Sequence, residues 1–185
     1  MEYFKENETQ LEFGGFYESI HSEIIDNHIE YFIESENSEF NTNKEYDDYD
    51  FDFDSMHNQY IKQYCEMLSN YIKNEYNLNV EFTDLKLISP SYYNYSTDKI
   101  ECKVSNHKNI INYFKNDDNF LDFLNQATQS YDGYTSHYDF NQAINNKNNI
   151  LMVYIFKYIC NEFYDNAYFY DIYIDIELEK EKEIA

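Results

Sequence analysis

The chain has 185 residues and a formal net charge of −23 at pH 7, from 36 Asp and Glu against 13 basic residues, all of them Lys. Without Arg the chain lacks bidentate phosphate clamps. At this net charge we therefore expect no direct binding to nucleic acid. Net charge bears on solubility and partners rather than on the fold, and the excess of carboxylates therefore favours a basic protein partner.

The first quarter of the chain predicts a short strand, a helix and a loop. Residues 9–13 alternate weakly, and Gly14-Gly15 follows as a turn. Ser19 is a plausible N-cap for a helix. From 34 to 54 no helical period survives, which predicts a long acidic loop, extended at its end. The helix has its apolar side chains on one face, at Ile20, Ile24, Ile25, Ile29, Phe32 and Ile33.

Residues 55–76 give the clearest helical pattern, with Asp54 or Ser55 as the expected cap. Two strands, 79–88 and 99–104, are expected to pair as antiparallel neighbours across a Tyr-rich connection that follows Ser89-Pro90. The apolar face of the helix comprises Met56, Tyr60, Ile61, Tyr64, Cys65, Leu68, Tyr71 and Ile72.

The remainder predicts two short helices at 109–115 and 117–129, a loop at 131–138 and a central helix at 141–163. A last strand is predicted by period two, with Tyr168, Tyr170, Ile172, Ile174, Ile176 and Leu178 facing one way and Asp171, Asp175, Glu177 and Glu179 the other. Together these elements predict one α+β domain over residues 1–185, in which a small, mostly antiparallel sheet of about four strands is packed by about five helices.

The candidate functional segment is EYDDYDFDFD, residues 45–54. Same-face carboxylates on an extended strand lie roughly 6.6–6.8 Å apart, close to the spacing of successive phosphates on a nucleic-acid strand. Such a row can occupy Lys and Arg sites that bind a phosphate backbone, and the interleaved rings can anchor the contact. The predicted partner-binding residues are Glu45, Tyr46, Asp47, Asp48, Tyr49, Asp50, Phe51, Asp52, Phe53 and Asp54.

Two other interpretations of this segment stay open at the level of sequence. One is a solvated acidic loop. The other is a calcium loop beginning at Asp50, although the sixth position holds Ser55 instead of Gly and the twelfth holds Ile61 instead of Glu. The second acidic row, in the last predicted strand, is favoured as the solvent face of an edge strand, where charges block aggregation.

Other chemistry finds little support in the sequence. The five His form no metal-binding pair and no phosphate-binding or nucleophile motif is present, so no catalytic residue, metal or cofactor is predicted. Cys65, Cys102 and Cys160 have no metal spacing and predict free thiols in a reducing cytoplasm. The longest apolar stretch, 150–160, is too short to span a membrane. An enzyme or ligand-binding protein using the Gly14-Gly15 and Tyr92–Asp98 loops is the alternative.

Two segments, FGGFYESIHSEIID at 13–26 and SPSYYNYSTDKIECKV at 89–104, resemble blocks in small proteins carried by phages and other mobile elements. The resemblance implies an accessory protein, and such proteins often inhibit host restriction or CRISPR nucleases. We therefore expect an anti-defence protein that binds a host nuclease in the host cytoplasm through an acidic, nucleic-acid-mimicking surface. An acidic immunity or assembly protein for another basic partner is the further alternative, and the sequence leaves the oligomeric state open.

Overall fold

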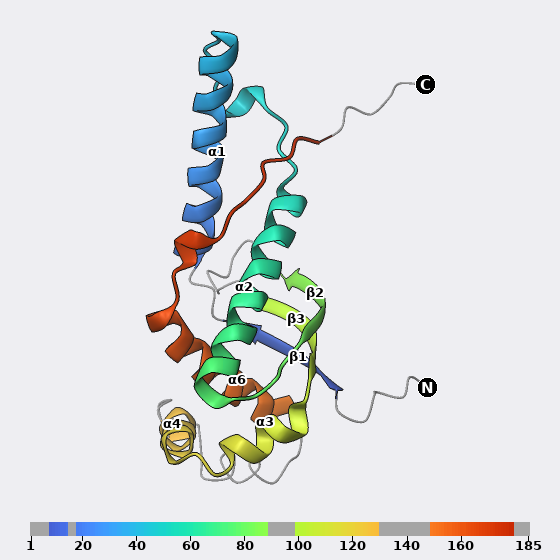
Figure 1. The fold of residues 1–185 in the computed structure, drawn as a ribbon, viewed down its shortest axis with the longest axis vertical. Coiled ribbons are helices and arrows are strands. Elements are labelled where there is room, and N and C mark those ends of the chain that lie inside the picture. Colours follow the sequence, from blue (N-terminus) through green and yellow to red (C-terminus); the bar gives the residue numbers. More distant parts are fainter. Residues whose placement is uncertain (1–7, 15–17, 89–98, 130–148, 180–185) are drawn as a thin grey trace, which may run out of the picture.

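The structure, a computed structural model, describes residues 8–14, 18–88, 99–129 and 149–179. The described part is an α+β fold with five α-helices and a small antiparallel sheet. A body holds the sheet and most of the helices, and one long helix projects from it (Figure 1). The helices are α1 (Glu18–Phe40), α2 (Phe53–Tyr76), α3 (His107–Phe114), α4 (Asp118–Gln129) and α6 (Asn149–Asn166), with 3-10 turns η1 (Tyr46–Asp48) and η2 (Phe169–Asp171).

The sheet has three strands in the described part of the chain, β1 (Glu8–Gly14), β2 (Phe82–Ile88) and β3 (Lys99–Ser105), in the order β1-β3-β2. Both pairings are antiparallel, as predicted for β2 and β3. Leu11 of β1 lies opposite Cys102 of β3, and both are buried on one face. On the outer strand β2 the register shifts between Thr83 and Lys86.

The helices bury that face of the sheet, with α6 beside β1 and α2 beside β2. Tyr64 of α2 stacks on Phe169 and meets Phe163 of α6 edge to face. Its hydroxyl donates to the Cys160 sulfur at 3.9 Å. In the described part of the chain, one continuous cluster of buried side chains runs from Leu11 to Ile174. The buried residues of α2 are Met56, Tyr60, Ile61, Tyr64, Cys65, Leu68 and Ile72, which confirms the predicted face except for Tyr71, which is half-buried.

Helix α1 is longer than its apolar pattern predicts. It continues to Phe40, so the predicted acidic loop at 34–54 is wrong for residues 34–40. Helix propensity explains the extension, since Glu and Ser remain compatible with a solvated helix even without an apolar face. The end is fixed by Asn41, whose φ of 50° is left-handed, and by Asn37, which binds the chain that follows. Ser19 lies inside the helix rather than at its N-cap.

The predicted fourth strand is also corrected. Residues 172–179 are extended, and the alternation holds for Ile172, Ile174 and Ile176, but the segment joins no sheet in the described structure. Its single ladder contact is an isolated bridge between Leu178 and Phe51. Turn η2 shifts the phase at the start, so that Phe169 is buried and Tyr168 is 77 % exposed. Alternation reports an extended chain with one buried face and does not specify what pairs with its backbone.

The other short elements agree with their predictions to within a few residues: β1, α3 and α4 lie at the expected places. Helix α6 begins at Asn149, and the predicted helical residues 141–148 lie outside the described part, as do the predicted loop at 131–138 and the Tyr92–Asp98 connection. No helix in the described ranges is long and apolar enough to cross a membrane.

Candidate protein-binding arm

The charge of the protein is concentrated on the part that projects from the body. We define the acidic arm as residues 18–54 and 168–179, which form α1, the connection to α2, the first residues of α2 and the segment after α6. These residues include 17 carboxylates and one lysine, Lys44. The rest of the described chain holds 12 carboxylates and 8 lysines. The negative field is therefore built mainly by the arm.

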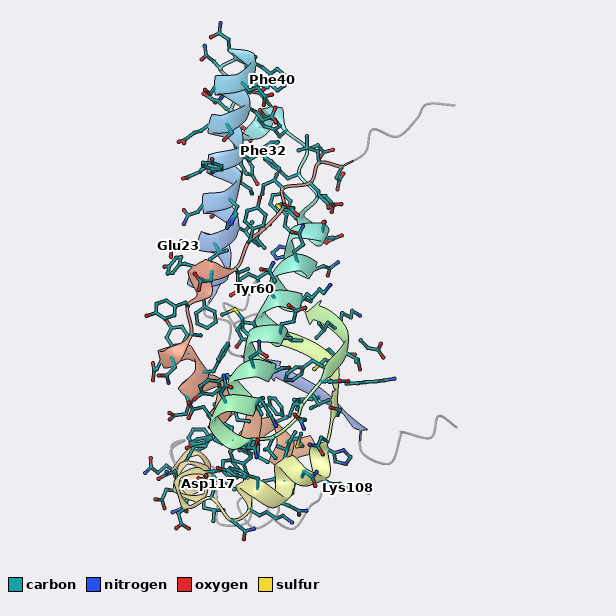
Figure 2. All side chains as sticks on the ribbon, in the orientation of Figure 1. Glu23, Phe32, Phe40, Tyr60, Lys108 and Asp117 are labelled. Atoms are coloured by element: carbon teal, nitrogen blue, oxygen red, sulfur yellow. The ribbon has the colours of Figure 1, made fainter. Side chains whose placement is uncertain are left out.

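The arm has a core of aromatic rings. Phe51 is only 3 % exposed and meets Phe32 of α1 edge to face, with ring centroids 6.1 Å apart. Tyr49 stacks on Phe51 at 5.5 Å and also contacts Phe32. In Figure 2, Phe32 points from α1 toward the chain that leads into α2. Of the predicted anchor rings, Phe51 thus holds the segment together, whereas Tyr46 and Phe53 are 48 % and 40 % exposed.

The C-terminal segment, residues 172–179, brings the second acidic row to the first. The Asp52 amide donates to the Glu177 carbonyl at 2.8 Å, and the Glu179 amide donates to the Asp50 carbonyl at 2.8 Å. The Ser55 hydroxyl donates to a carboxylate oxygen of Glu177 at 2.7 Å. Sequence reasoning treated the two rows separately and favoured a solvent-facing edge strand for the second. The structure pairs the ends of the two rows, residues 50–52 with residues 177–179.

Two glutamines of α2 hold the C-terminal segment by its backbone. Gln59 donates to the Asp175 carbonyl at 2.9 Å and accepts from the Asp175 amide at 2.8 Å. Gln63 makes the same pair of bonds with Tyr173, at 2.6 and 3.0 Å. The spacing explains the match, because i, i+4 on a helix covers about 6 Å and i, i+2 on an extended chain about 6.7 Å. These side-chain amides make the backbone hydrogen bonds that a neighbouring strand would otherwise make. Sequence patterns do not reveal such bonds.

Several of the predicted site carboxylates have local structural tasks. Asp52 caps α2, accepting from the Ser55 amide at 3.1 Å, and Asp48 accepts from the Glu45 amide at 2.7 Å. Such caps satisfy amides that a helix end leaves unpaired. The exposed carboxylates of the two rows that accept no cap bond in the structure include Asp47, Asp50, Asp54, Asp171, Asp175 and Glu179. These side chains are the ones best placed to meet a partner.

Close packing of carboxylates changes the acidity of nearby hydroxyls. The pKa of Tyr49 is raised from its usual value by loss of hydration and then by the charges of Glu36 and Asp48. The pKa of Tyr170 is raised mainly by Glu23, whose carboxylate accepts a hydrogen bond from the Tyr170 hydroxyl at 3.2 Å. Lys44, the arm's lysine, lies over the Tyr49 ring with its ammonium nitrogen 5.5 Å from the centroid.

Exposed aromatic side chains also gather on the arm. Ten large hydrophobic side chains are exposed in the described part of the chain, and only Tyr113 and Val153 belong to the body. Figure 2 places Phe40 at the far end of α1. Rings exposed amid charge are typical of protein-protein contacts. The exposed hydrophobic residues of the arm are Tyr31, Phe40, Tyr46, Phe53, Tyr168, Tyr170, Tyr173 and Leu178.

The described part of the chain gives less support for an enzyme active site or a metal site than for a binding surface. The described residues contain no group of three or more His, Cys, Asp or Glu side chains that could hold a metal ion. An open groove of about 910 Å³ lies between α2 and β2, where Lys62, Glu66 and Asp84 contribute charged groups. Cys65 also lines it, but burial raises the pKa of that thiol far above neutrality, so the thiol stays protonated. Cys65 is therefore not activated as a nucleophile.

Comparison with known proteins gives no relative: no family model, curated protein or solved structure matches this chain. The resemblance of residues 13–26 and 89–104 to phage and mobile-element proteins stays a prediction.

Proposed function

We propose that the protein is an anti-defence inhibitor that acts in the host cytoplasm, binds a host nuclease of a CRISPR or restriction system through the acidic arm, and competes with nucleic acid for the basic groove of that nuclease. The observation that carries the proposal is that the two acidic rows lie on one arm with a single lysine and are paired through residues 50–52 and 177–179.

Electrostatics supports a protein partner over other ligands. A duplex presents about one charge per 1.7 Å, and two adjoining rows of carboxylates approach such density better than one row does. At physiological salt the Debye length is about 8 Å, so charges on neighbouring segments of the arm act together on a basic surface. The same field repels DNA and RNA.

The construction of the arm supports the proposal further. Ring packing around Phe51 and the bonds from Gln59 and Gln63 to the C-terminal segment hold the backbone in place. Because these contacts use rings, amides and carbonyls, the outer carboxylates are held without being neutralised. A preorganised charged surface speeds association and loses less entropy on binding.

The test compares two variants with equal net charge. The arm variant carries Asp47→Asn, Asp50→Asn, Asp54→Asn, Asp175→Asn and Glu179→Gln. The body variant carries Glu66→Gln, Glu75→Gln, Asp118→Asn, Asp122→Asn and Asp165→Asn. Both change the charge from −23 to −18. Immobilised parent and variants are used to capture proteins from a host lysate at low and high salt, and captured nucleases are then assayed for cleavage.

We expect the parent and the body variant to capture and inhibit the same nuclease, with inhibition relieved by excess DNA. The arm variant should associate more slowly and inhibit less. Equal inhibition by the arm variant would contradict the proposal. Capture of a basic protein that is not a nuclease would support the immunity or assembly alternative instead.

A further inference from the structure

Turn η2 and the residues after it present an unusual pair of exposed rings. Tyr170 is 63 % exposed and Tyr173 is 65 % exposed, while Phe169, Ile172 and Ile174 on either side of them are buried. The buried residues supply the packing of this segment against the core. Packing therefore does not account for the two tyrosines, because most of each side chain remains in water.

Each ring is held in place by a contact with α1. The Tyr170 hydroxyl donates to Glu23 at 3.2 Å, and Tyr173 meets the His28 ring edge to face with centroids 5.6 Å apart. Glu23 and His28 are five residues apart, which is about 7.5 Å along a helix. The two tyrosines thus contact α1 at two successive levels, beginning near its base where Figure 2 labels Glu23.

The neighbours of the rings are carboxylates. Asp171 and Asp175 are exposed on either side of Tyr173, and Glu23 is bonded to Tyr170. An apolar partner docking here would remove these carboxylates from water without pairing them. Nucleic-acid bases can stack on tyrosines, but the charge of the arm repels their phosphates. The complementary ligand is a cation that has a flat face.

We infer that Tyr170 and Tyr173, with the carboxylates beside them, bind arginine side chains of the basic partner. A guanidinium can stack on a tyrosine ring while its N–H groups donate to a neighbouring carboxylate, whereas an ammonium cannot stack in this way. The inference rests on the proposed function in that it assigns the partner's basic groove an arginine-rich edge. It adds a contact outside residues 45–54 that depends on ring geometry as well as charge.

The experiment uses the full chain and two labelled peptides of equal charge, ten arginines and ten lysines, titrated by fluorescence anisotropy at about 0.15 M salt. We expect the arginine peptide to bind more tightly. Tyr170→Ser with Tyr173→Ser should lower its affinity about 5- to 30-fold, from two rings at about 0.5–1 kcal/mol each, and should affect the lysine peptide less. Tyr170→Phe with Tyr173→Phe keeps the rings and should retain the preference. Tyr31→Ser, an exposed ring elsewhere on α1, is the matched control.

Equal affinity for both peptides, loss of the preference in the phenylalanine variant or in Tyr31→Ser, or no binding of either peptide would overturn the inference. These outcomes are separate from the proposed function, which is measured by nuclease inhibition. A parent that inhibits a nuclease without preferring arginine would refute the role of the tyrosines and leave the proposed function standing.

Discussion

Replacing Gln59 and Gln63 by Ala tests how the acidic arm is assembled. The double variant removes the four hydrogen bonds between these amides and the backbone of Tyr173 and Asp175. A typical bond contributes about 0.5–1.5 kcal/mol, and because these backbone groups are exposed, water replaces part of each bond. The expected loss is about 2 kcal/mol, and the two sites are not additive because they hold the same segment.

Hydrophobic burial decides what happens to the segment in that variant. Phe169, Ile172 and Ile174 are buried, and each contributes about 1.5–3 kcal/mol when removed from water. Their sum exceeds the loss from the glutamines, so the segment should loosen locally and stay docked. Ile174→Ala, which acts on the packing instead, should cost about 2–5 kcal/mol.

Amide hydrogen exchange measures the effect directly, because the amides of Tyr173 and Asp175 are the donors to the two glutamines. We expect faster exchange at these two amides and a modest fall in melting temperature. Asn74→Ala, an exposed position near the other end of α2, controls for the helix propensity of Ala. Unchanged exchange at both amides would refute the view that the glutamines hold the segment.

Three further predictions concern the folded state as a whole. Leu68→Ala, at a fully buried position of α2, should cost about 2–5 kcal/mol in denaturant unfolding, and a loss below about 1 kcal/mol would argue against its place in the core. Added salt should raise the melting temperature, because it screens repulsion within the arm; a flat or falling midpoint would mean that the carboxylates are already neutralised. Burial raises the pKa of Tyr60 and Tyr76, so their contribution to stability is full below about pH 10, where unfolded tyrosine titrates, and is lost as pH rises toward the folded pKa. Absorbance of tyrosinate should then rise together with loss of circular dichroism, and titration of all tyrosines near pH 10 without unfolding would contradict this.

The sequence predicts the local elements well where an apolar face exists. Helix α2 and its buried positions follow from a spacing sustained over its whole length, and β2 and β3 follow from two short runs beside a turn. It fails where structure depends on groups far apart in the chain. The polar end of α1 has no apolar face from which a helix could be predicted. The C-terminal segment is bound by Gln59 and Gln63, which precede their partners by 116 and 110 positions.

The candidate site, too, could be predicted from the sequence only in part. The acidic composition of residues 45–54 is visible in the sequence, but the union with residues 171–179 needs the fold. Phe51 was predicted as an anchor together with Tyr46 and Phe53, but η1 begins at Tyr46 and α2 begins at Phe53, so neither ring follows the extended alternation that turns Phe51 inward. Tyr170 was predicted on the apolar face of the last strand, and turn η2 explains why it is exposed instead. Tyr173 alternates with Asp171 and Asp175 and so falls on the acidic face of that prediction.

The distribution of lysines supports the proposal that the repulsion within the arm is retained for binding. Eight described lysines lie on the body, and one of them, Lys103, pairs with Asp84 at 3.2 Å. The same number of charges placed along α1 would relieve much of the repulsion through i, i+4 pairs at little structural cost. Instead, Lys44 is the arm's lysine, and the backbone there is held by rings and amides. A scaffold with no basic partner gains nothing by leaving its carboxylates unpaired and holding its backbone with rings and amides. A surface that must offer unpaired carboxylates to a partner requires this arrangement.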